Sequence, residues 1–225
     1  MAAEKVEEGK NYAIYREGDQ ELIMLKNIRL SFPHFGTKSQ SDNDDGTTSE
    51  SWNGVAMLPK KTHDAAKIAF VKVMNKVIEG KKDDKGNPVK VESANKCIKN
   101  GDEKEQAEYA DHWIISFSDS NRRPAIRDKA GNIIFEVEKI DNAFYGGCWA
   151  NVMLRPWYFN GKSKRKPDKT YPKRICCGFT GAQFVRDDTP FGAGRIDDSN
   201  AWGAVEDDGD DGLGGSQSIS SDDDF

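Results

Sequence analysis

The longest stretch of alternating character in this chain runs from Phe144 to Phe159. From Phe144 to Leu154 every second residue is small or apolar, while the residues between them, from Tyr145 to Arg155, are mostly aromatic or polar. A period of two places the two sets on opposite faces of a β-strand. One face suits a barrel interior and the other a surface. The chain therefore has to build a sheet around this segment.

Five further segments predict strands from their apolar, β-branched and aromatic residues. In the last of them Gly181 is expected to mark a bulge, because the apolar positions change phase around it. The polar stretch 80–106 is expected to be a loop with at most a short strand near Val89–Val91. The run 36–51 has no apolar residue and predicts a solvated loop. The five strands are Leu22–Phe32 (ending at Pro33), Trp52–Leu58, His112–Ser118, Ile133–Val137 and Arg174–Val185.

The first of these strands is expected to bury one face. Arg29 lies on the opposite, polar face of this strand, where an alternation of period two places it. The residues of the buried face are Leu22, Met24, Ile28, Leu30 and Phe32.

One helix is predicted, from Thr62 to about Glu79. Thr62 can cap its N-terminus and Gly80 ends it. Five or more strands with one main helix, and no regular alternation of strands and helices, predict a small, mainly β, barrel-like fold with long inserted loops. The apolar stripe of the helix consists of Ala66, Phe70, Val73 and Val77.

The charge of the chain is divided unevenly. The whole sequence has 33 Lys and Arg against 38 Asp and Glu, a net charge of −5. Residues 197–225 hold ten of the acidic residues and no Lys or Arg, which leaves 33 basic and 28 acidic residues before them. A mildly basic body is therefore joined to an acidic tail, and the two need separate explanations.

Several classes of protein are not indicated by the sequence. No apolar run approaches the ~18 residues of a membrane span, and the N-terminal residues lack the apolar segment of a signal peptide. An intracellular protein with no membrane contact is expected, and its four cysteines are expected to be reduced thiols. No zinc spacing and no phosphate-binding or dinucleotide motif is present. We therefore expect no cofactor and no metal.

The polar face of the Phe144–Phe159 segment is the first candidate for a functional surface. It carries large aromatic rings interleaved with Asn and Arg, which can stack on nucleobases and contact phosphates. The alternative is that these rings pack under the long insertions as a second small core. The candidate residues are Tyr145, Trp149, Asn151, Arg155 and Trp157.

A basic loop after this segment strengthens the nucleic-acid interpretation. The loop 160–172 carries many Lys and Arg against one acid, Asp168, and would guide a phosphate backbone toward the aromatic strand. A charged run alone is usually a solvated loop. The prediction of nucleic-acid binding therefore depends on the basic loop and the aromatic strand together. The candidates here are Lys162, Lys164, Arg165, Lys166, Lys173 and Arg174, with Arg29, Arg122 and Arg123 as secondary candidates.

The C-terminal residues form a second candidate site. Residues 197–225 are rich in Gly, Ser and Asp and are expected to be disordered. Asp222, Asp223 and Asp224 precede a terminal Phe225, which makes an anionic segment with an apolar end. A partner protein with a basic pocket and an apolar floor could bind it. The alternative is a tail that only improves solubility.

The chain resembles a known family of proteins in both its tail and its body. Its tail is similar to the acidic, Phe-terminated tails of bacterial and phage single-stranded DNA-binding proteins. Its body resembles a phage family of OB-fold single-stranded DNA-binding proteins, formerly a domain of unknown function. The matching stretches are Asn27–Pro33, Tyr145–Ala150, Phe184–Asp188 and Pro190–Arg195.

The resemblance implies a five-stranded OB barrel that coats single-stranded DNA without sequence preference during phage replication or recombination, with no catalysis. It implies a phage-encoded protein in the cytoplasm of the bacterial host, whose tail docks replication or recombination proteins. The expected domains are an extension at 1–20, the OB domain at 21–196 and the disordered acidic tail at 197–225. The sequence gives no oligomeric state.

Two other functions stay open from the residues alone. One is an acidic-tailed adaptor or chaperone that does not bind DNA. The other, less favoured, is a metal-dependent nuclease, which would need carboxylates on rigid elements. Most acids of this chain lie in predicted loops or in the tail, and Glu136 and Glu138 have no obvious third partner.

Overall fold

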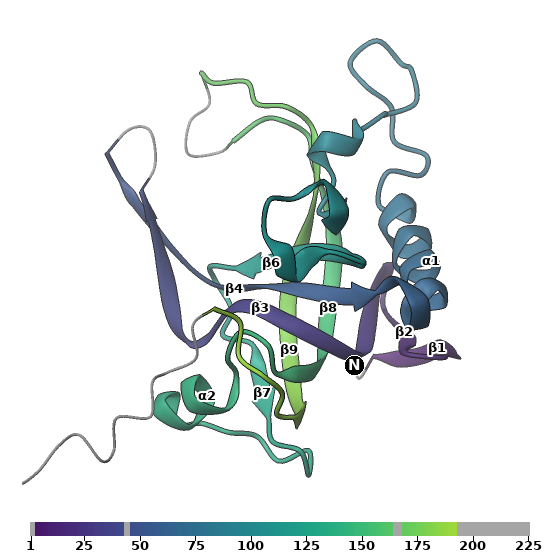
Figure 1. Ribbon diagram of the computed structural model, residues 1–225. Coiled ribbons are helices and arrows are strands. Elements are labelled where there is room, and N and C mark those ends of the chain that lie inside the picture. Colours follow the sequence, from purple (N-terminus) through teal and green to yellow (C-terminus); the bar gives the residue numbers. More distant parts are fainter. Residues whose placement is uncertain (1–2, 43–45, 164–167, 193–225) are drawn as a thin grey trace, which may run out of the picture. The chain divides into compact units, whose positions relative to one another are not determined.

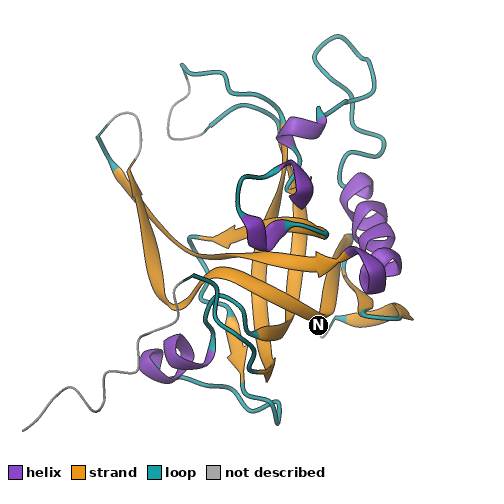
Figure 2. Cartoon of the chain, viewed as in Figure 1, coloured by secondary structure: helices purple, strands orange, loops and turns teal. Residues whose placement is uncertain are grey.

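The computed structural model describes residues 3–42, 46–163 and 168–192. Within them the chain is mainly β, with two α-helices and three short 3-10 helices (Figures 1 and 2). The strands are β1 (Glu4–Gly9), β2 (Tyr12–Glu17), β3 (Gln20–Asp42), β4 (Thr48–Pro59), β5 (Ile98–Asn100), β6 (His112–Asp119), β7 (Ala125–Arg127), β8 (Trp149–Phe159) and β9 (Arg174–Arg186). The helices are α1 (Lys60–Lys76), α2 (Val137–Ala143) and the 3-10 helices η1 (Ser93–Asn95), η2 (Gly101–Glu103) and η3 (Ala107–Tyr109).

All nine strands of the described residues belong to one sheet. Its order is β5-β6-β4-β3-β8-β9-β7, and β1 joins it through β2, which pairs with the first part of β3. The pairs are antiparallel except for β7 with β9. The expectation of a mainly β chain is confirmed. The expected five-stranded barrel is not what the sheet shows, because the sheet has nine strands and is open.

Strand β3 is the central element of the sheet. Its first part pairs with β2 on one side and β8 on the other, and its second part pairs with β4. The prediction that this strand ends at Pro33 was wrong. The β3–β4 register shifts between Ser31 and His34, so Pro33 lies in an irregular stretch where its missing N–H removes no ladder hydrogen bond.

The run 36–51, predicted as a solvated loop, is instead a paired hairpin. Ser39 pairs with Ser51, and Asp42 pairs with Thr48. We call residues 36–42 and 48–53 the arm (Figure 1). Polar residues form a strand here because the ladder uses backbone groups, and both faces of the arm carry polar side chains.

The expected buried face of β3 was only partly right. A register shift between Leu25 and Ile28, where Asn27 has a φ of 52°, changes which residues point inward. Ile23 and Leu25 therefore share the core with Ile28 and Leu30. Phe32, expected in the core, is exposed.

The main core lies between the strands and α1. Phe35, Phe117, Phe144 and Phe179 form its aromatic centre, with ring centroids of Phe35 and Phe179 at 4.6 Å. From β8 it takes Ala150, Val152 and Leu154, so the small and apolar face of this strand is buried as predicted. The strand itself begins at Trp149 and not at Phe144.

Helix α1 is confirmed, but its start differs from the prediction. It begins at Lys60 after Pro59, and Thr62 does not cap it. The Thr62 hydroxyl instead lies 2.8 Å from Nδ1 of His63, whose Nε2 lies 3.0 Å from the carbonyl of Lys26. Of the predicted stripe, Ala66, Phe70 and Val73 are buried and Val77 is half-buried.

Of the four remaining strand predictions, one was wrong and three were confirmed. Ile133–Val137 forms only a single bridge, between Ile133 and Arg127, and then enters α2, so the described residues contain two α-helices and not one. The stretch 80–106 has its strand at Ile98–Asn100 and not near Val89. The confirmed strands correspond to β4, β6 and β9, and the predicted bulge is confirmed by a register shift in which Met153 pairs with Gly181 but Leu154 with Phe179.

Two edges of the sheet approach each other. An isolated bridge joins Lys96, just before β5, to Ile175 of β9. The rings of Phe117 in β6 and Phe179 in β9 lie 4.8 Å apart between these strands. We call this line the β6–β9 seam. Within the described residues, no helix is long and apolar enough to cross a membrane.

Candidate nucleic-acid interface

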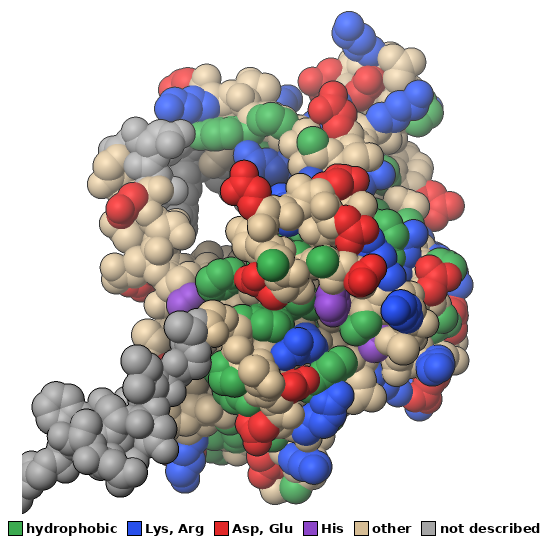
Figure 3. Space-filling view, in the orientation of Figure 1, with side chains coloured by type: hydrophobic (Ala, Val, Ile, Leu, Met, Phe, Trp, Pro, Cys, Tyr) green, Lys and Arg blue, Asp and Glu red, His purple; other side chains and the backbone are tan. Residues whose placement is uncertain are grey.

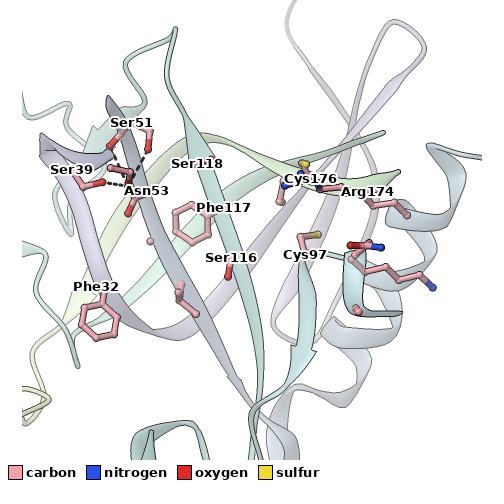
Figure 4. A pocket seen from close by; sticks show the side chains of 18 of the residues that line it. Phe32, Ser39, Ser51, Asn53, Cys97, Ser116, Phe117, Ser118, Arg174 and Cys176 are labelled. Atoms are coloured by element: carbon pink, nitrogen blue, oxygen red, sulfur yellow. Dashed lines mark hydrogen bonds between the residues drawn. The ribbon is translucent and has the colours of Figure 1, made fainter. Parts of the chain in front are cut away.

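A groove of about 670 Å³ opens between the arm, β6 and the start of β9 (Figure 4). The space-filling view shows the hollow beside the arm (Figure 3). Its volume falls in the range of ~300–1,000 Å³ typical of ligand sites. Many of its lining residues carry hydroxyl, amide or cationic groups: Ser39, Ser41, Ser51, Asn53, Asn95, Lys96, Ser116, Ser118 and Arg174. Such groups are the usual donors to phosphate oxygens and base edges.

Phe32 gives the groove an exposed aromatic ring. Its side chain is 61% exposed, and its φ is 46°, in the left-handed region that a bulky residue rarely adopts. Holding such a residue there costs about 1–3 kcal/mol, and this kind of strain is concentrated at functional sites. Phe32 was predicted to lie on the buried face of its strand. Pro33 interrupts regular strand pairing directly after Phe32. This proline was the sequence signal that the Phe32 side chain could be exposed.

The basic residues predicted after β8 reach the groove in part. Arg174 lines it, with its guanidinium 5.8 Å from the Phe159 ring. Lys173 is half-buried beside Arg174. Lys162 forms an isolated bridge with Thr170, and its Nζ lies 3.8 Å from a carboxylate oxygen of Asp84. The predicted Lys164, Arg165 and Lys166 lie outside the described residues.

Three cysteines line one end of the groove: Cys97, Cys176 and Cys177. Burial raises the pKa of the Cys176 thiol. Burial and a hydrogen bond with Cys97 raise the pKa of Cys177 well above its ordinary value. At neutral pH Cys176 and Cys177 are therefore uncharged thiols, and they contribute a soft, weakly polar surface to the groove.

Tyr145, Trp149 and Arg29 lie together in another place, outside the groove. The Trp149 indole N–H donates to the Asp188 carboxylate at 2.6 Å, and the Tyr145 hydroxyl lies 3.0 Å from a carboxylate oxygen of Asp187. Arg29 donates to the carbonyls of Gly147 (3.1 Å) and Thr189 (3.0 Å). The Trp149 ring also lies 4.0 Å from the guanidinium of Arg186.

These contacts correspond to the packing alternative considered for the aromatic strand. Each predicted residue of this cluster holds the segment 186–191 against β3 and β8. Hydrogen bonding to Trp149 lowers the pKa of Asp188, so the acceptor is a carboxylate at neutral pH. A DNA-contact role for Tyr145, Trp149 and Arg29 stays a prediction.

The remaining predicted residues lie along the outer face of β8 and beyond the seam. Asn151 accepts a hydrogen bond from the backbone N–H of Asn27 and donates one to Gln183. Arg155 and Trp157 line a second pocket of about 550 Å³. Arg122 and Arg123, from the turn after β6, line the same pocket. The structure thus brings four predicted residues together here, although they are far apart in the sequence.

No group of three or more His, Cys, Asp or Glu residues that could hold a metal ion occurs in the described part of the chain. The polar residues that line the groove offer hydrogen bonds from Ser and Asn side chains and positive charge from Lys96 and Arg174. This composition suits the binding of a polyanion with exposed rings.

A family model described as "Enterobacter phage Enc34, ssDNA-binding protein" matches residues 21–213. The chain belongs to this family. The family description agrees with the expectation of a DNA-binding protein and not an enzyme. Among curated proteins, none matches this chain.

Solved structures of the Enc34 protein are similar to this chain. The single-stranded DNA-binding protein from bacteriophage Enc34 has a TM-score of 0.69 and 26% identity, over 89% of this chain and 99% of that chain. Its complex with single-stranded DNA has a TM-score of 0.70 and 26% identity, over 84% and 98% of the two chains. A C-terminally truncated form has a TM-score of 0.67 and 25% identity, over 84% and 98%.

Proposed function

We propose that this chain binds single-stranded DNA without sequence preference, with the groove beside the arm as its principal site. The observation that carries this proposal is the groove itself, in which an exposed Phe32, Arg174 and a set of hydroxyl and amide groups face one channel. The similarity of this chain to the bacteriophage Enc34 protein in complex with single-stranded DNA supports the same ligand.

The groove has the features that sequence-tolerant binding needs. Every nucleobase has a face that can stack on an aromatic ring, and Phe32 offers one. Arg174 and Lys96 supply positive charge for phosphates, while the serines and Asn53 supply neutral hydrogen bonds. Among the described residues, none of those that line the groove is Asp or Glu.

We propose that the open sheet is an elaborated OB-type barrel. The Lys96–Ile175 bridge and the Phe117–Phe179 contact bring its edges together at the β6–β9 seam. OB barrels bind oligonucleotides on one strand face between two loops. Here the arm and the described residues 160–163 and 168–173, between β8 and β9, would take the place of those two loops. The proposed domains keep their expected bounds: an extension at 1–20, the OB domain at 21–196 and the acidic tail at 197–225.

The proposed biological role is coating of single-stranded DNA during phage replication or recombination, in the cytoplasm of the bacterial host. The tail residues Asp222, Asp223, Asp224 and Phe225 are proposed to dock partner proteins of those processes. Their charge and apolar end fit a basic pocket with an apolar floor on the partner. They lie outside the described residues.

The test is a titration of labelled oligo-dT followed by fluorescence anisotropy at several salt concentrations. Phe32→Ala and Arg174→Ala are each expected to weaken binding about five- to 150-fold, the range expected from the loss of one stacked base or one charged contact. Phe135→Ala is the matched control, since Phe135 is also exposed but does not line the groove.

Arg174→Ala is also expected to reduce the salt slope by about 0.7, because one phosphate contact is lost on a single strand. Wild-type protein that shows no binding to oligo-dT would overturn the proposed function. Equal losses in Phe135→Ala and Phe32→Ala would remove the groove as the site.

A further inference from the structure

We propose that a second nucleotide subsite lies across the β6–β9 seam, in the pocket formed by Arg122, Arg123, Arg155 and Trp157. This inference rests on the proposed function and extends it. A DNA strand leaving the groove would cross the seam and place one further base on Trp157, with its phosphates on the three arginines. The protein would then bind DNA along two neighbouring surfaces, and the groove alone would not set the length of the site.

The two cavities adjoin at the seam. Ser118 lines both the groove and the second pocket. On either side of it, Phe117 lines the groove and Phe179 lines the second pocket, and their rings touch beneath the seam at 4.8 Å. A flexible polymer can follow this path without leaving the protein surface.

Trp157 offers a stacking surface of the required kind. Its side chain is 45% exposed, so one part of the indole is free to receive a base. The ring of Phe159 packs against it edge to face at a centroid distance of 6.4 Å and fixes its position. It therefore differs from Trp149, whose indole N–H is bonded to Asp188 and whose ring lies beside Arg186.

Arg155 has binding capacity that the described residues leave unused. Its Nε is buried and has no hydrogen-bond partner there. Its ion pair with Glu17 is long, at 3.7 Å. Because this Nε is inaccessible, a phosphate would contact the terminal guanidinium nitrogens, which the long ion pair with Glu17 leaves available.

The turn after β6 adds two more cations. Asp119, the acid of this turn, accepts the backbone N–H groups of Asn121 and Arg122, so its carboxylate is engaged by the turn itself. Arg123 donates one N–H to the carbonyl of Phe135 at 2.9 Å and keeps its other donors. Lys38 of the arm reaches the carbonyl of Ser120 at 3.1 Å, which places positive charge between the groove and the pocket.

These features favour a nucleotide over an acidic peptide. Arginines with a flat aromatic ring fit a phosphate next to a base, and the pocket adjoins the groove that we propose for DNA. An acidic peptide would use the same arginines but would need no connection with the groove. The experiment separates the two through its dependence on DNA length.

The test measures the affinity of full-length protein for oligo-dT of increasing length, from about 4 to about 16 nucleotides, the range covered by one such fold. The variants are Trp157→Ala and the double variant Arg122→Ala with Arg123→Ala. Lys10→Ala with Lys61→Ala is the matched control, because both lysines are exposed and line neither cavity. Thermal unfolding of each variant checks that the fold is kept.

We expect the variants to bind the shortest oligonucleotides like wild type and the longer ones about five- to 150-fold more weakly. The double Arg variant should also lower the salt slope for long oligonucleotides by about 1.4, corresponding to two phosphates. The proposal is overturned if long and short oligonucleotides are affected equally or not at all. It is also overturned if only binding of a peptide with the sequence of residues 217–225 is lost. Phe32→Ala tests the groove separately. A negative result for the second subsite therefore does not overturn the proposed binding of single-stranded DNA in the groove.

Discussion

Arg29 shows how one side chain can be read in two ways. It was a secondary candidate for DNA contact because it lies on the polar face of a strand. In the structure its guanidinium lies 4.5 Å from the Phe191 ring and donates to the carbonyls of Gly147 and Thr189. It fastens the segment after β9 to β3. Arg, Trp and Tyr occur both in intramolecular hydrogen-bond networks and on nucleic-acid-binding surfaces. The alternation in β8 could therefore predict which residues lie opposite the core, but not whether they contact DNA or other parts of the protein.

Asp188 should make the stability of this network depend on pH. Its pKa is lowered chiefly by the hydrogen bond from Trp149. A carboxylate with a lowered folded-state pKa stabilises the fold above its ordinary pKa of ~3.9, and this contribution is lost as pH falls through the folded value. Asp188→Asn should therefore lower the free energy of unfolding by about 1 kcal/mol at pH 7 and by less near pH 3.

Thermal unfolding followed by circular dichroism between pH 3 and 7 measures this difference. Asp64→Asn, which removes an exposed carboxylate within α1, is the control for a general loss of charge. A difference between wild type and Asp188→Asn that is the same at every pH would contradict the assignment.

The four cysteines should differ in reactivity. Burial raises the pKa of Cys148 to about 11, and the thiolate is the reactive form. Cys177 is also buried, whereas Cys97 and Cys176 are partly exposed. With Ellman's reagent near pH 8, the native protein should release colour from two thiols at most on the time scale of minutes, and from all four in denaturant. Rapid reaction of four thiols in native protein would refute this burial pattern.

At the scale of elements, the sequence predicts best where apolar periodicity is strong. Strands β4, β6 and β9 and helix α1 have clear patterns and were predicted. The arm was not, because its polar residues carry no periodic signal and their pairing comes from backbone groups that extend the β3–β4 ladder. The groove depends on the arm, so the sequence could not reveal the groove, although Arg174, which lines it, was among the predicted contact residues.

Gly181 has a steric role in β9 that a substitution can test. A Cβ at this position would lie 2.6 Å from the carbonyl oxygen of Ala125 in the parallel strand β7. Gly181→Ala should destabilise the protein by about 1–3 kcal/mol, since the backbone of β7 has to move. Gly178→Ala is the matched control in the same strand, where the nearest atom, the Arg155 carbonyl oxygen, is 3.3 Å away.

Chemical denaturation measures both variants, with the midpoint and slope fitted together. The expected order is a clear loss for Gly181→Ala and a smaller one for Gly178→Ala. The reverse order would show that the β7–β9 approach is looser than described.

At the scale of the whole molecule, charge separates the chain into a body with five more basic than acidic residues and a tail with ten acidic residues and no Lys or Arg. If the tail docks partners as proposed, its carboxylates are also expected to compete with DNA phosphates for the Lys and Arg side chains of the body. Removing residues 217–225 should therefore tighten oligo-dT binding several-fold at low salt and abolish capture of replication proteins. The effect on DNA should disappear at high salt, because screening weakens the competition.

The comparison is made by anisotropy titration and by affinity capture from phage-infected cells. Replacing Asp222, Asp223 and Asp224 by Asn while keeping Phe225 separates charge from the terminal ring. Identical DNA affinity and identical capture after the deletion would reject the proposed role of the tail.

The position of β3 in the sheet also affects how the chain can fold as it is synthesised. Ile23 of β3 pairs with Leu154 of β8, which leaves the ribosome 131 residues later. At ~5–20 residues per second this is a delay of roughly 7–26 s. The β2–β3 and β3–β4 hairpins can form early, but one side of β3 stays unpaired until β8 arrives. A nascent chain with an exposed apolar strand edge is prone to aggregate, so the yield of this protein during rapid expression should depend on translation rate and on chaperones that cover that edge.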